Sequence, residues 1–134
     1  MTSEHRIRLR GGWEREAEGQ VTKERQRVTL PADWPTDARS GFRLIRRFSA
    51  PPLDSIGEAV SLRLGSVPGL RRVWLNDRLI ASPAAGTDSL EIDLSDALSE
   101  RNMLVLEVDP AVWCDRGGKA EVWGLIALVI RSRP

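Results

Sequence analysis

Apolar and polar residues alternate along short stretches of this 134-residue chain, and 72–83 shows the pattern most clearly. Residues 72–75 (RVWL) alternate with a period of two, which is typical of a strand with one buried face. Asn76 and Asp77 follow, and both residue types tolerate a left-handed backbone. An apolar run then resumes at 79–81 (LIA). The pattern predicts a hairpin closed by a tight two-residue turn.

Other segments have the same period of two and are separated by turn residues such as glycine, proline and aspartate. They are 7–9, 13–16, 27–30, 42–48, 59–64, 90–94 and 104–109, followed by the nearly continuous apolar run 122–131. Ser95 predicts a helix cap for a short helical turn at 96–98, and no apolar stripe at helical spacing is long enough for a long helix. We therefore predict one all-β domain over 1–134, an antiparallel β-sandwich of about eight or nine strands with one short helical turn. The pattern leaves the topology open between immunoglobulin-like and jelly-roll sandwiches.

Three places in the predicted strands allow more than one local structure. Gly11 and Gly12 interrupt the first strand, which predicts a bulge or a bend there. Arg46 lies on the apolar face of 42–48, so it indicates either a strand bulge or a buried guanidinium that needs a carboxylate partner. The apolar run 122–131 is expected either in the middle of a sheet packed on both sides or at an interface.

Several of these segments carry motifs of a known family. The hairpin VWLND at 73–77 resembles the V-W-L-N-G hairpin of the sugar-binding jelly roll at the front of family 2 glycoside hydrolases. Residues 92–108 are similar to that domain's D-I-T … L … G-x-N-x-L-x-V-x-V segment, and 30–35 (LPADWP) to its L-P-x-D-W. In the same order, 46–48 (RRF) resembles its R-R-x-F, and 123–130 resembles its closing strand. The resemblance touches most of the chain.

The resemblance selects the jelly roll, also called the galactose-binding-domain-like fold. In that family the acid/base and the nucleophile belong to a separate barrel domain, so the resemblance implies no hydrolase activity for this chain. Two positions depart from the family pattern, because Asp77 and Arg101 stand where glycine is usual. Aspartate can hold a positive φ, whereas arginine does so only at a cost, so we expect the turns to differ in detail.

The balance of charge and the cysteine content narrow the choice of partner and compartment. The chain has 20 basic and 19 acidic residues, a net charge of +1, which argues against nucleic acid as a partner. Residues 1–6 lack the apolar core of a signal peptide, and no apolar run is long enough to span a bilayer. The lone Cys114 cannot form an internal disulfide. These features predict a cytoplasmic protein without membrane contact.

The residue types needed for catalysis or metal binding are sparse. A Ser-His-Asp or Cys-His arrangement would need His5, which we expect in a frayed terminus, and Cys114 has no base that the sequence reveals. One cysteine and one histidine cannot build a usual zinc site, and the aspartates lack EF-hand spacing. A glycosidase needs two carboxylates, yet Glu91, Asp93 and Glu107 alternate outward on strands. We therefore predict no catalytic residue, no metal and no cofactor.

Five tryptophans and no tyrosine indicate a possible sugar-binding platform, because an indole face can stack on a pyranose. Packing is expected for four of the five: Trp13, Trp34, Trp74 and Trp123. Trp113 differs because it lies in a Gly-rich loop beside Asp115 and Arg116. Our candidate ligand-binding residues are these three, with Asp33 and Arg39 from the loop at 32–41.

Two functional hypotheses follow from the sequence. The first is a non-catalytic carbohydrate-binding or accessory module that lacks the family's catalytic barrel. The alternative is a structural or protein-interaction module, which could be a homodimer, and it rests on the long apolar run 122–131. The expected partners are thus a carbohydrate, a protein or a second copy of this chain.

Overall fold

The computed structural model describes residues 4–17, 25–30, 42–50, 58–65, 67, 69–83, 89–109 and 126–132. These residues form ten β-strands and no helix. The strands are β1 (Glu4–Arg8), β2 (Trp13–Ala17), β3 (Arg25–Val28), β4 (Phe42–Ser49), β5 (Glu58–Leu64), β6 (Leu70–Leu75), β7 (Arg78–Ala81), β8 (Leu90–Asp93), β9 (Arg101–Val108) and β10 (Ile126–Ser132).

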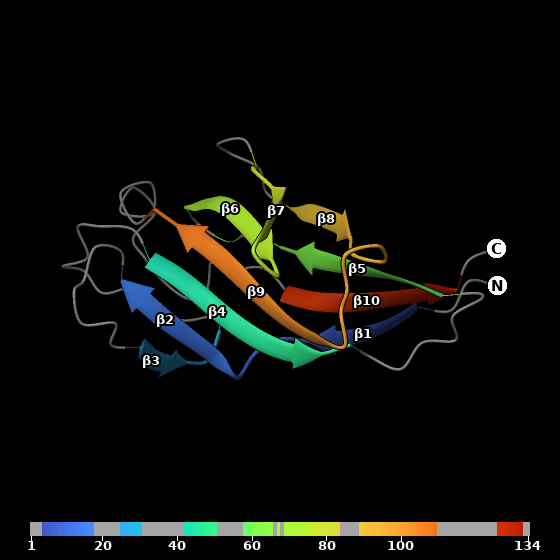
Figure 1. Ribbon diagram of the computed structural model, residues 1–134, viewed down its shortest axis with the longest axis horizontal. Helices are drawn as coiled ribbons and strands as arrows, with labels where there is room; N and C mark the ends of the chain where they lie inside the picture. Colours follow the sequence, from blue (N-terminus) through green and yellow to red (C-terminus); the bar gives the residue numbers. More distant parts are fainter. Residues whose placement is uncertain are drawn as a thin grey trace.

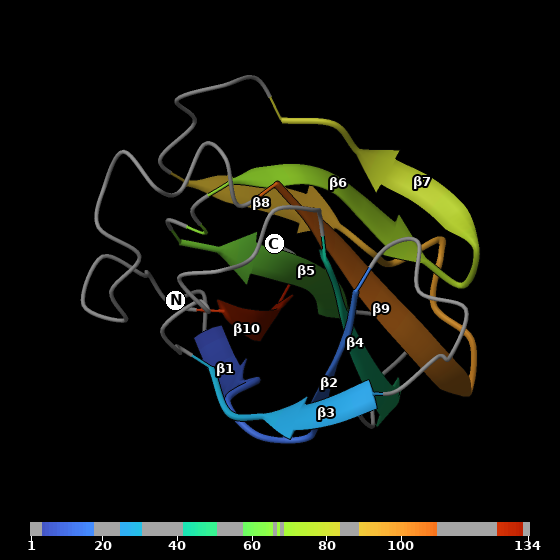
Figure 2. The ribbon, with the colours of Figure 1, turned by 90° about the vertical axis from the view of Figure 1, so that its left-hand side faces the viewer.

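Within these ranges the strands form two antiparallel sheets that pack face to face (Figure 1). One sheet has the order β1-β10-β5-β8, and the other has the order β3-β2-β4-β9-β6-β7. Figure 2 shows the six-stranded sheet curving around the four-stranded one. The predicted all-β sandwich is confirmed, with ten strands in place of the eight or nine expected.

The glycine pair Gly11-Gly12 marks a change of sheet. β1 ends at Arg8 in the four-stranded sheet, and β2 begins at Trp13 in the six-stranded sheet. Gly12 has a φ of 77°, which an L side chain rarely adopts. The predicted bend is present, but it separates two strands of different sheets, because a period of two shows which face is buried and not which sheet the strand joins.

The predicted helical turn at 96–98 is not seen. Instead, the carbonyl of Leu94 accepts hydrogen bonds from both Ala97 N and Leu98 N, at 2.9 and 3.1 Å. Ser95 was expected to cap a helix, yet its Oγ accepts a 3.2 Å bond from the amide of Val60 at the side of β5. The segment is therefore a single hydrogen-bonded turn that ties the end of β8 to the neighbouring strand.

The inward faces of both sheets build one hydrophobic core. Trp13 is 0% exposed, and its indole Nε1 donates a 2.8 Å hydrogen bond to the carbonyl of Leu9, so its predicted packing role is confirmed. The other fully buried members come from both sheets and from the turn after β8: Leu44, Val60, Leu62, Leu64, Val73, Leu75, Leu94, Leu104, Leu106 and Val108.

Arg46 fits neither structure expected for it. β4 pairs with β2 and with β9 without a register shift, so no bulge is present at Arg46. Its guanidinium lies over Gly12, where a Cβ would come within 2.9 Å of Arg46 Cζ, and it donates to the carbonyl of Arg47. Its Nε is buried and has no hydrogen-bond partner in the described part of the chain. A backbone carbonyl and a glycine surface thus take the place of the expected carboxylate.

The hairpin turn between β6 and β7 forms as predicted. Asn76 and Asp77 have φ angles of 51° and 66°, so aspartate holds the positive φ for which the family uses glycine. Arg101, the second departure, is the first residue of β9 and is not among the positive-φ residues, so it bears no such cost.

Two asparagines fix this hairpin to the start of β9. Asn76 Oδ1 accepts a 2.8 Å bond from Met103 N, and Asn76 Nδ2 donates a 3.0 Å bond to Asn102 Oδ1. Asn102 is 4% exposed and is held further by Ser99, whose amide donates to Oδ1 and whose carbonyl accepts from Nδ2, each at 2.9 Å. The asparagines of the two family-like motifs therefore meet in one hydrogen-bonded cluster.

Candidate functional site

All five predicted ligand-binding residues lie outside the described part of the chain: Asp33, Arg39, Trp113, Asp115 and Arg116. The same holds for Cys114, Trp34 and Trp123. Their roles therefore stay predictions, and the described residues offer the outer faces and edges of the two sheets as candidate surfaces.

His5 was expected in a frayed terminus, and this expectation is wrong. His5 lies in β1, where it is exposed and pairs in register with Ile130 of β10. Within the described ranges, no cluster of three or more histidine, cysteine, aspartate or glutamate side chains could hold a metal ion. The same ranges contain no helix long and apolar enough to cross a membrane.

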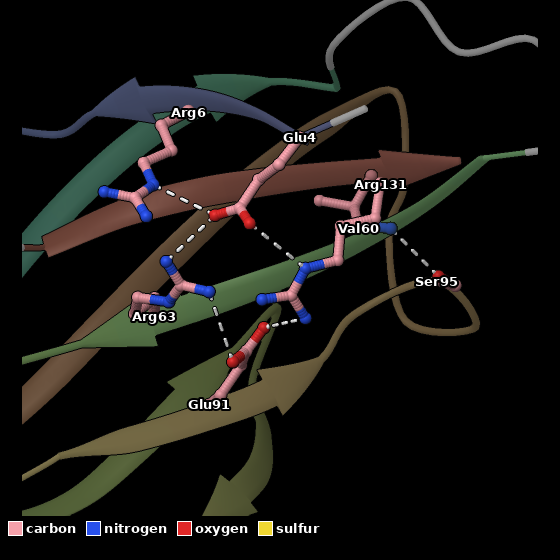
Figure 3. Close-up of polar contacts among 7 residues, drawn as sticks. All are labelled: Glu4, Arg6, Val60, Arg63, Glu91, Ser95 and Arg131. Atoms are coloured by element: carbon pink, nitrogen blue, oxygen red, sulfur yellow. Dashed lines mark hydrogen bonds and ion pairs between the residues drawn. The ribbon is translucent and has the colours of Figure 1, made fainter. Parts of the chain in front are cut away.

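The outer face of the four-stranded sheet carries a network of ion pairs that reaches all four strands (Figure 3). Glu4 of β1 contacts Arg63 of β5 at 3.0 Å and Arg131 of β10 at 3.7 Å. Glu91 of β8 contacts the same two arginines, at 3.5 and 2.6 Å. Arg6 adds a 2.9 Å contact to Glu4. Two carboxylates and two arginines thus close a ring over the sheet.

This network covers the outer face of β10. In register, Val129 lies between Arg6 and Ser61, and Ala127 lies between Arg8 and Arg63, yet both apolar residues are 0% exposed. The aliphatic stems of the arginines can cover such apolar surface while their charged ends stay hydrated. β10 is therefore a central strand with both faces buried, although side chains and not a second packed layer cover its outer face. Of the segment 122–131, the structure describes 126–131.

The network makes Glu4 a poor acid catalyst. The hydrogen bond from Arg6 holds the pKa of Glu4 below its ordinary value of 4.5; burial opposes this shift, and the hydrogen bond and charge of Arg63 reinforce it. A glycosidase acid needs the opposite, a raised pKa, so that it still carries a proton near neutral pH. Glu4 therefore does not have the electrostatics of a hydrolytic acid.

We expect Glu4 to make stability depend on acid pH. Because the folded-state pKa is lowered, the stabilisation is present above pH 4.5 and is lost as the pH falls below that value. Thermal melts from pH 7 to pH 3 should show a steeper fall in Tm for the native chain than for Glu4→Gln. Glu100→Gln, at an exposed position, is the matched control and should follow the native curve. Parallel curves for the native chain and Glu4→Gln would contradict this prediction.

Trp74 lies on the outer face of the six-stranded sheet, so its expected role in the core is wrong. The alternation in 72–75 that buries Val73 and Leu75 turns Trp74 outward and leaves it half-buried. Its Nε1 donates a 2.7 Å hydrogen bond to Glu107 Oε1 on β9, and Arg72 lies 3.6 Å from Glu107 Oε2. The period of two itself indicates this orientation, because it places Trp74 on the face opposite Val73 and Leu75.

Trp74 belongs to an apolar row that crosses four strands on this outer face. The strand register places Ile45 of β4, Val105 of β9, Trp74 of β6 and Leu79 of β7 side by side. Ile45 is buried at one end of the row, whereas Leu79 at the other end is 46% exposed. The two sheets thus differ, because ion pairs cover the apolar residues of one outer face and the apolar row of the other opens to solvent at β7.

Several solved structures that match this chain over part of their length are glycosidases. The chain matches a calcium-binding mutant of Bacteroides uniformis β-glucuronidase 2, with a TM-score of 0.76 and 17% identity over 96% of this chain and 18% of the other. It matches β-D-glucuronidase of Dictyoglomus thermophilum with a TM-score of 0.73 and 16% identity, over 97% of this chain and 28% of the other. A putative β-galactosidase of Bacteroides fragilis matches with a TM-score of 0.73 and 15% identity, over 96% of this chain and 23% of the other. No protein-family model and no curated protein matches the chain.

These matches confirm the jelly-roll fold that the motifs predicted. The chain spans about a fifth to just over a quarter of the length of the three glycosidases, so it corresponds to one part of each.

Proposed function

We propose that this chain is a non-catalytic accessory module that binds carbohydrate. The observation that carries the proposal is the fold match, in which nearly the whole chain corresponds to a minor part of much longer glycosidases. The lowered pKa of Glu4 also supports a role without acid catalysis at the network it belongs to.

The ligand contact is assigned to the loop residues that the sequence indicates. Trp113 would stack on the apolar face of a pyranose, and Asp115 and Arg116 would bond its hydroxyls. Asp33 and Arg39 would add polar contacts from the other loop. Loops at the ends of a sandwich are the usual place for such contacts, because the scaffold holds them while their sequence varies freely.

Calorimetric titration with a panel of mono- and oligosaccharides at millimolar concentration tests this proposal. We expect weak binding of at least one saccharide and a loss of about tenfold or more in affinity for Trp113→Ala, equivalent to about 1.4 kcal/mol. Trp74→Ala is the matched control, since it removes an indole from the sheet face and should leave the affinity unchanged. Absence of any binding would remove the proposal, and loss of binding only in Trp74→Ala would contradict the loop assignment.

A protein-interaction module, with self-association as one form, is the second candidate. It was first based on the apolar run 122–131, but β10 is a central strand whose outer face is covered. The observation that favours it now is the exposed Leu79 beside Trp74 at the other sheet. Light scattering that gives a strict monomer, together with no co-purifying protein, would count against this candidate.

A further inference from the structure

A short connection between the two sheets joins β1 to β2. β1 forms one edge of the four-stranded sheet, beside β10, whereas β2 belongs to the six-stranded sheet (Figure 2). The connection comprises residues 9–12, of which Arg10, Gly11 and Gly12 are exposed. A change in the path of these three residues therefore displaces no buried side chain of the connection itself.

The two glycines allow the connection to be either a turn or an extended chain. Gly12 holds the turn with a φ of 77°, and glycine adopts extended conformations as well. A Cβ at Gly11 would meet nothing within 4 Å, so this position is not packed against the fold. Leu9 and Trp13 both lie in the core and are four positions apart. A straight chain between them therefore keeps the period of two of both strands.

β1 fits one place on β10 through its backbone and through both of its faces. Residues 4–8 pair in antiparallel register with residues 131–127. Ile7 packs against the core on one face. On the other face, Glu4 contacts Arg63 at 3.0 Å and Arg131 at 3.7 Å (Figure 3). A β1 strand from a second copy of this chain would make the same contacts, because its sequence is identical.

Hydrogen bonds hold the closed turn between β1 and β2. Trp13 Nε1 donates a 2.8 Å bond to the carbonyl of Leu9, and the amide of Leu30 donates a 2.7 Å bond to the carbonyl of Arg10. Straightening of the connection would disturb these bonds, and β1 would have to leave β10 first. We therefore expect the closed chain to dominate in dilute solution, and high protein concentration to favour an exchanged form.

We propose that two copies of this chain exchange β1, so that β1 of each copy pairs with β10 of the other. Residues 9–12 would then run extended between the copies. A second copy is the occupant because its β1 reproduces the register, the core contact and the ion pairs together. This inference goes beyond the proposed carbohydrate function, since it uses none of the candidate loop residues. The dimer would present two sets of those loops, which would raise the avidity for a multivalent glycan.

Refolding at high protein concentration tests for the exchange. Incubation in urea near the unfolding midpoint separates β1 from β10, and rapid removal of the urea lets β1 pair with either copy. Size-exclusion chromatography with light scattering should then show a dimer whose yield rises with protein concentration. The dimer should persist after dilution, because return to the monomer requires β1 to leave β10 again. Recovery of monomer alone at every concentration would overturn the proposal.

Charge reversal shows whether β1 pairs across copies. Glu4→Arg places like charges beside Arg63 and Arg131, and Arg63→Glu places like charges beside Glu4. In an exchanged dimer of the two variants, native Glu4 meets native Arg63, and the two introduced charges meet each other. Refolding of the mixture should therefore enrich the mixed dimer about tenfold over the statistical ratio, measured by native mass spectrometry. A mixture of Glu100→Arg and Arg78→Glu, both at exposed positions outside β1 and β10, is the matched control and should give the statistical ratio. A statistical ratio for the first mixture as well would contradict the exchange.

Two further variants separate this dimer from other kinds of association. Leu79→Lys disrupts the exposed apolar position on the other sheet and should leave the dimer yield unchanged. Loss of the dimer in this variant would show that the β7 face is the interface, and the proposal would be wrong. Deletion of Gly11 and Gly12 shortens the connection and should raise the fraction of dimer about tenfold or more. A folded deletion variant that stays monomeric would equally overturn the proposal. Saccharide titration of separated monomer and dimer keeps this test distinct from that of the carbohydrate proposal, because the dimer yield is measured without sugar.

Discussion

Replacing Asn102 by leucine is expected to lower the free energy of unfolding by about 3–5 kcal/mol. The side chain is 4% exposed, and its amide makes three hydrogen bonds, to Asn76 Nδ2 and to the N–H and C=O of Ser99. Leucine has the same branched shape and the same number of side-chain heavy atoms, but it cannot bond these polar groups, which lose their partner. A buried group left without a hydrogen bond costs about 1–3 kcal/mol, and a group on the exposed Ser99 costs less because water can replace part of the bond. A loss of this size is a large part of the stability of a domain, typically about 5–15 kcal/mol.

Urea denaturation measures this change through the midpoint and slope of the transition. Ser99→Ala is the matched control, because Asn102 bonds the backbone of Ser99 and the change leaves that backbone in place. It should alter stability by about 0.5 kcal/mol or less. If Asn102→Leu were as stable as Ser99→Ala, the asparagine cluster would not be what fastens the hairpin to β9.

The two asparagines also show where prediction from sequence reached its limit. Asn76 was correctly interpreted as a turn residue, because a tight hairpin needs a positive φ and that requirement is local. Its bond to Asn102, 26 positions away, depends on which strands become neighbours. A period of two places Val73 and Leu104 in the core, but it does not state that β6 pairs with β9.

The prediction of buried strand faces has the same limit. Alternation within each strand predicted the buried side of β6 and β9, and the structure confirms it. The cover over Ala127 and Val129 could not be predicted, because its charged residues come from four strands spread from Glu4 to Arg131. The sequence alone therefore could not show whether the apolar run 122–131 lies in the middle of a sheet or at an interface, because this depends on the order of the strands.

Gly69→Ala is expected to be about as damaging as the loss of Asn102, with a reduction of about 3 kcal/mol or more in the free energy of unfolding. Gly69 leads into β6 with a φ of 76°, a conformation that costs a residue with a Cβ about 1–2 kcal/mol. Its carbonyl accepts a 2.8 Å bond from Asp109 N at the end of β9, which holds the two backbones close together. An alanine Cβ would overlap the backbone carbonyl oxygen of Asp109 and lie 3.4 Å from Val108 Cγ1. Because a backbone atom cannot rotate away as a side chain does, relief would require moving β6 from β9 in the centre of the six-stranded sheet.

Gly11→Ala separates this effect from the general cost of replacing a glycine. A Cβ at Gly11 would meet nothing within 4 Å, and Gly11 is not among the glycines with positive φ. Alanine there should leave the stability unchanged or raise it by about 0.5 kcal/mol, because it restricts the unfolded chain. Thermal melts of both variants decide the matter, with a large fall in Tm expected for Gly69→Ala alone. Equal Tm values for the two would mean that the β6–β9 junction tolerates a side chain, and that the close approach of Gly69 and Asp109 does not constrain the sheet.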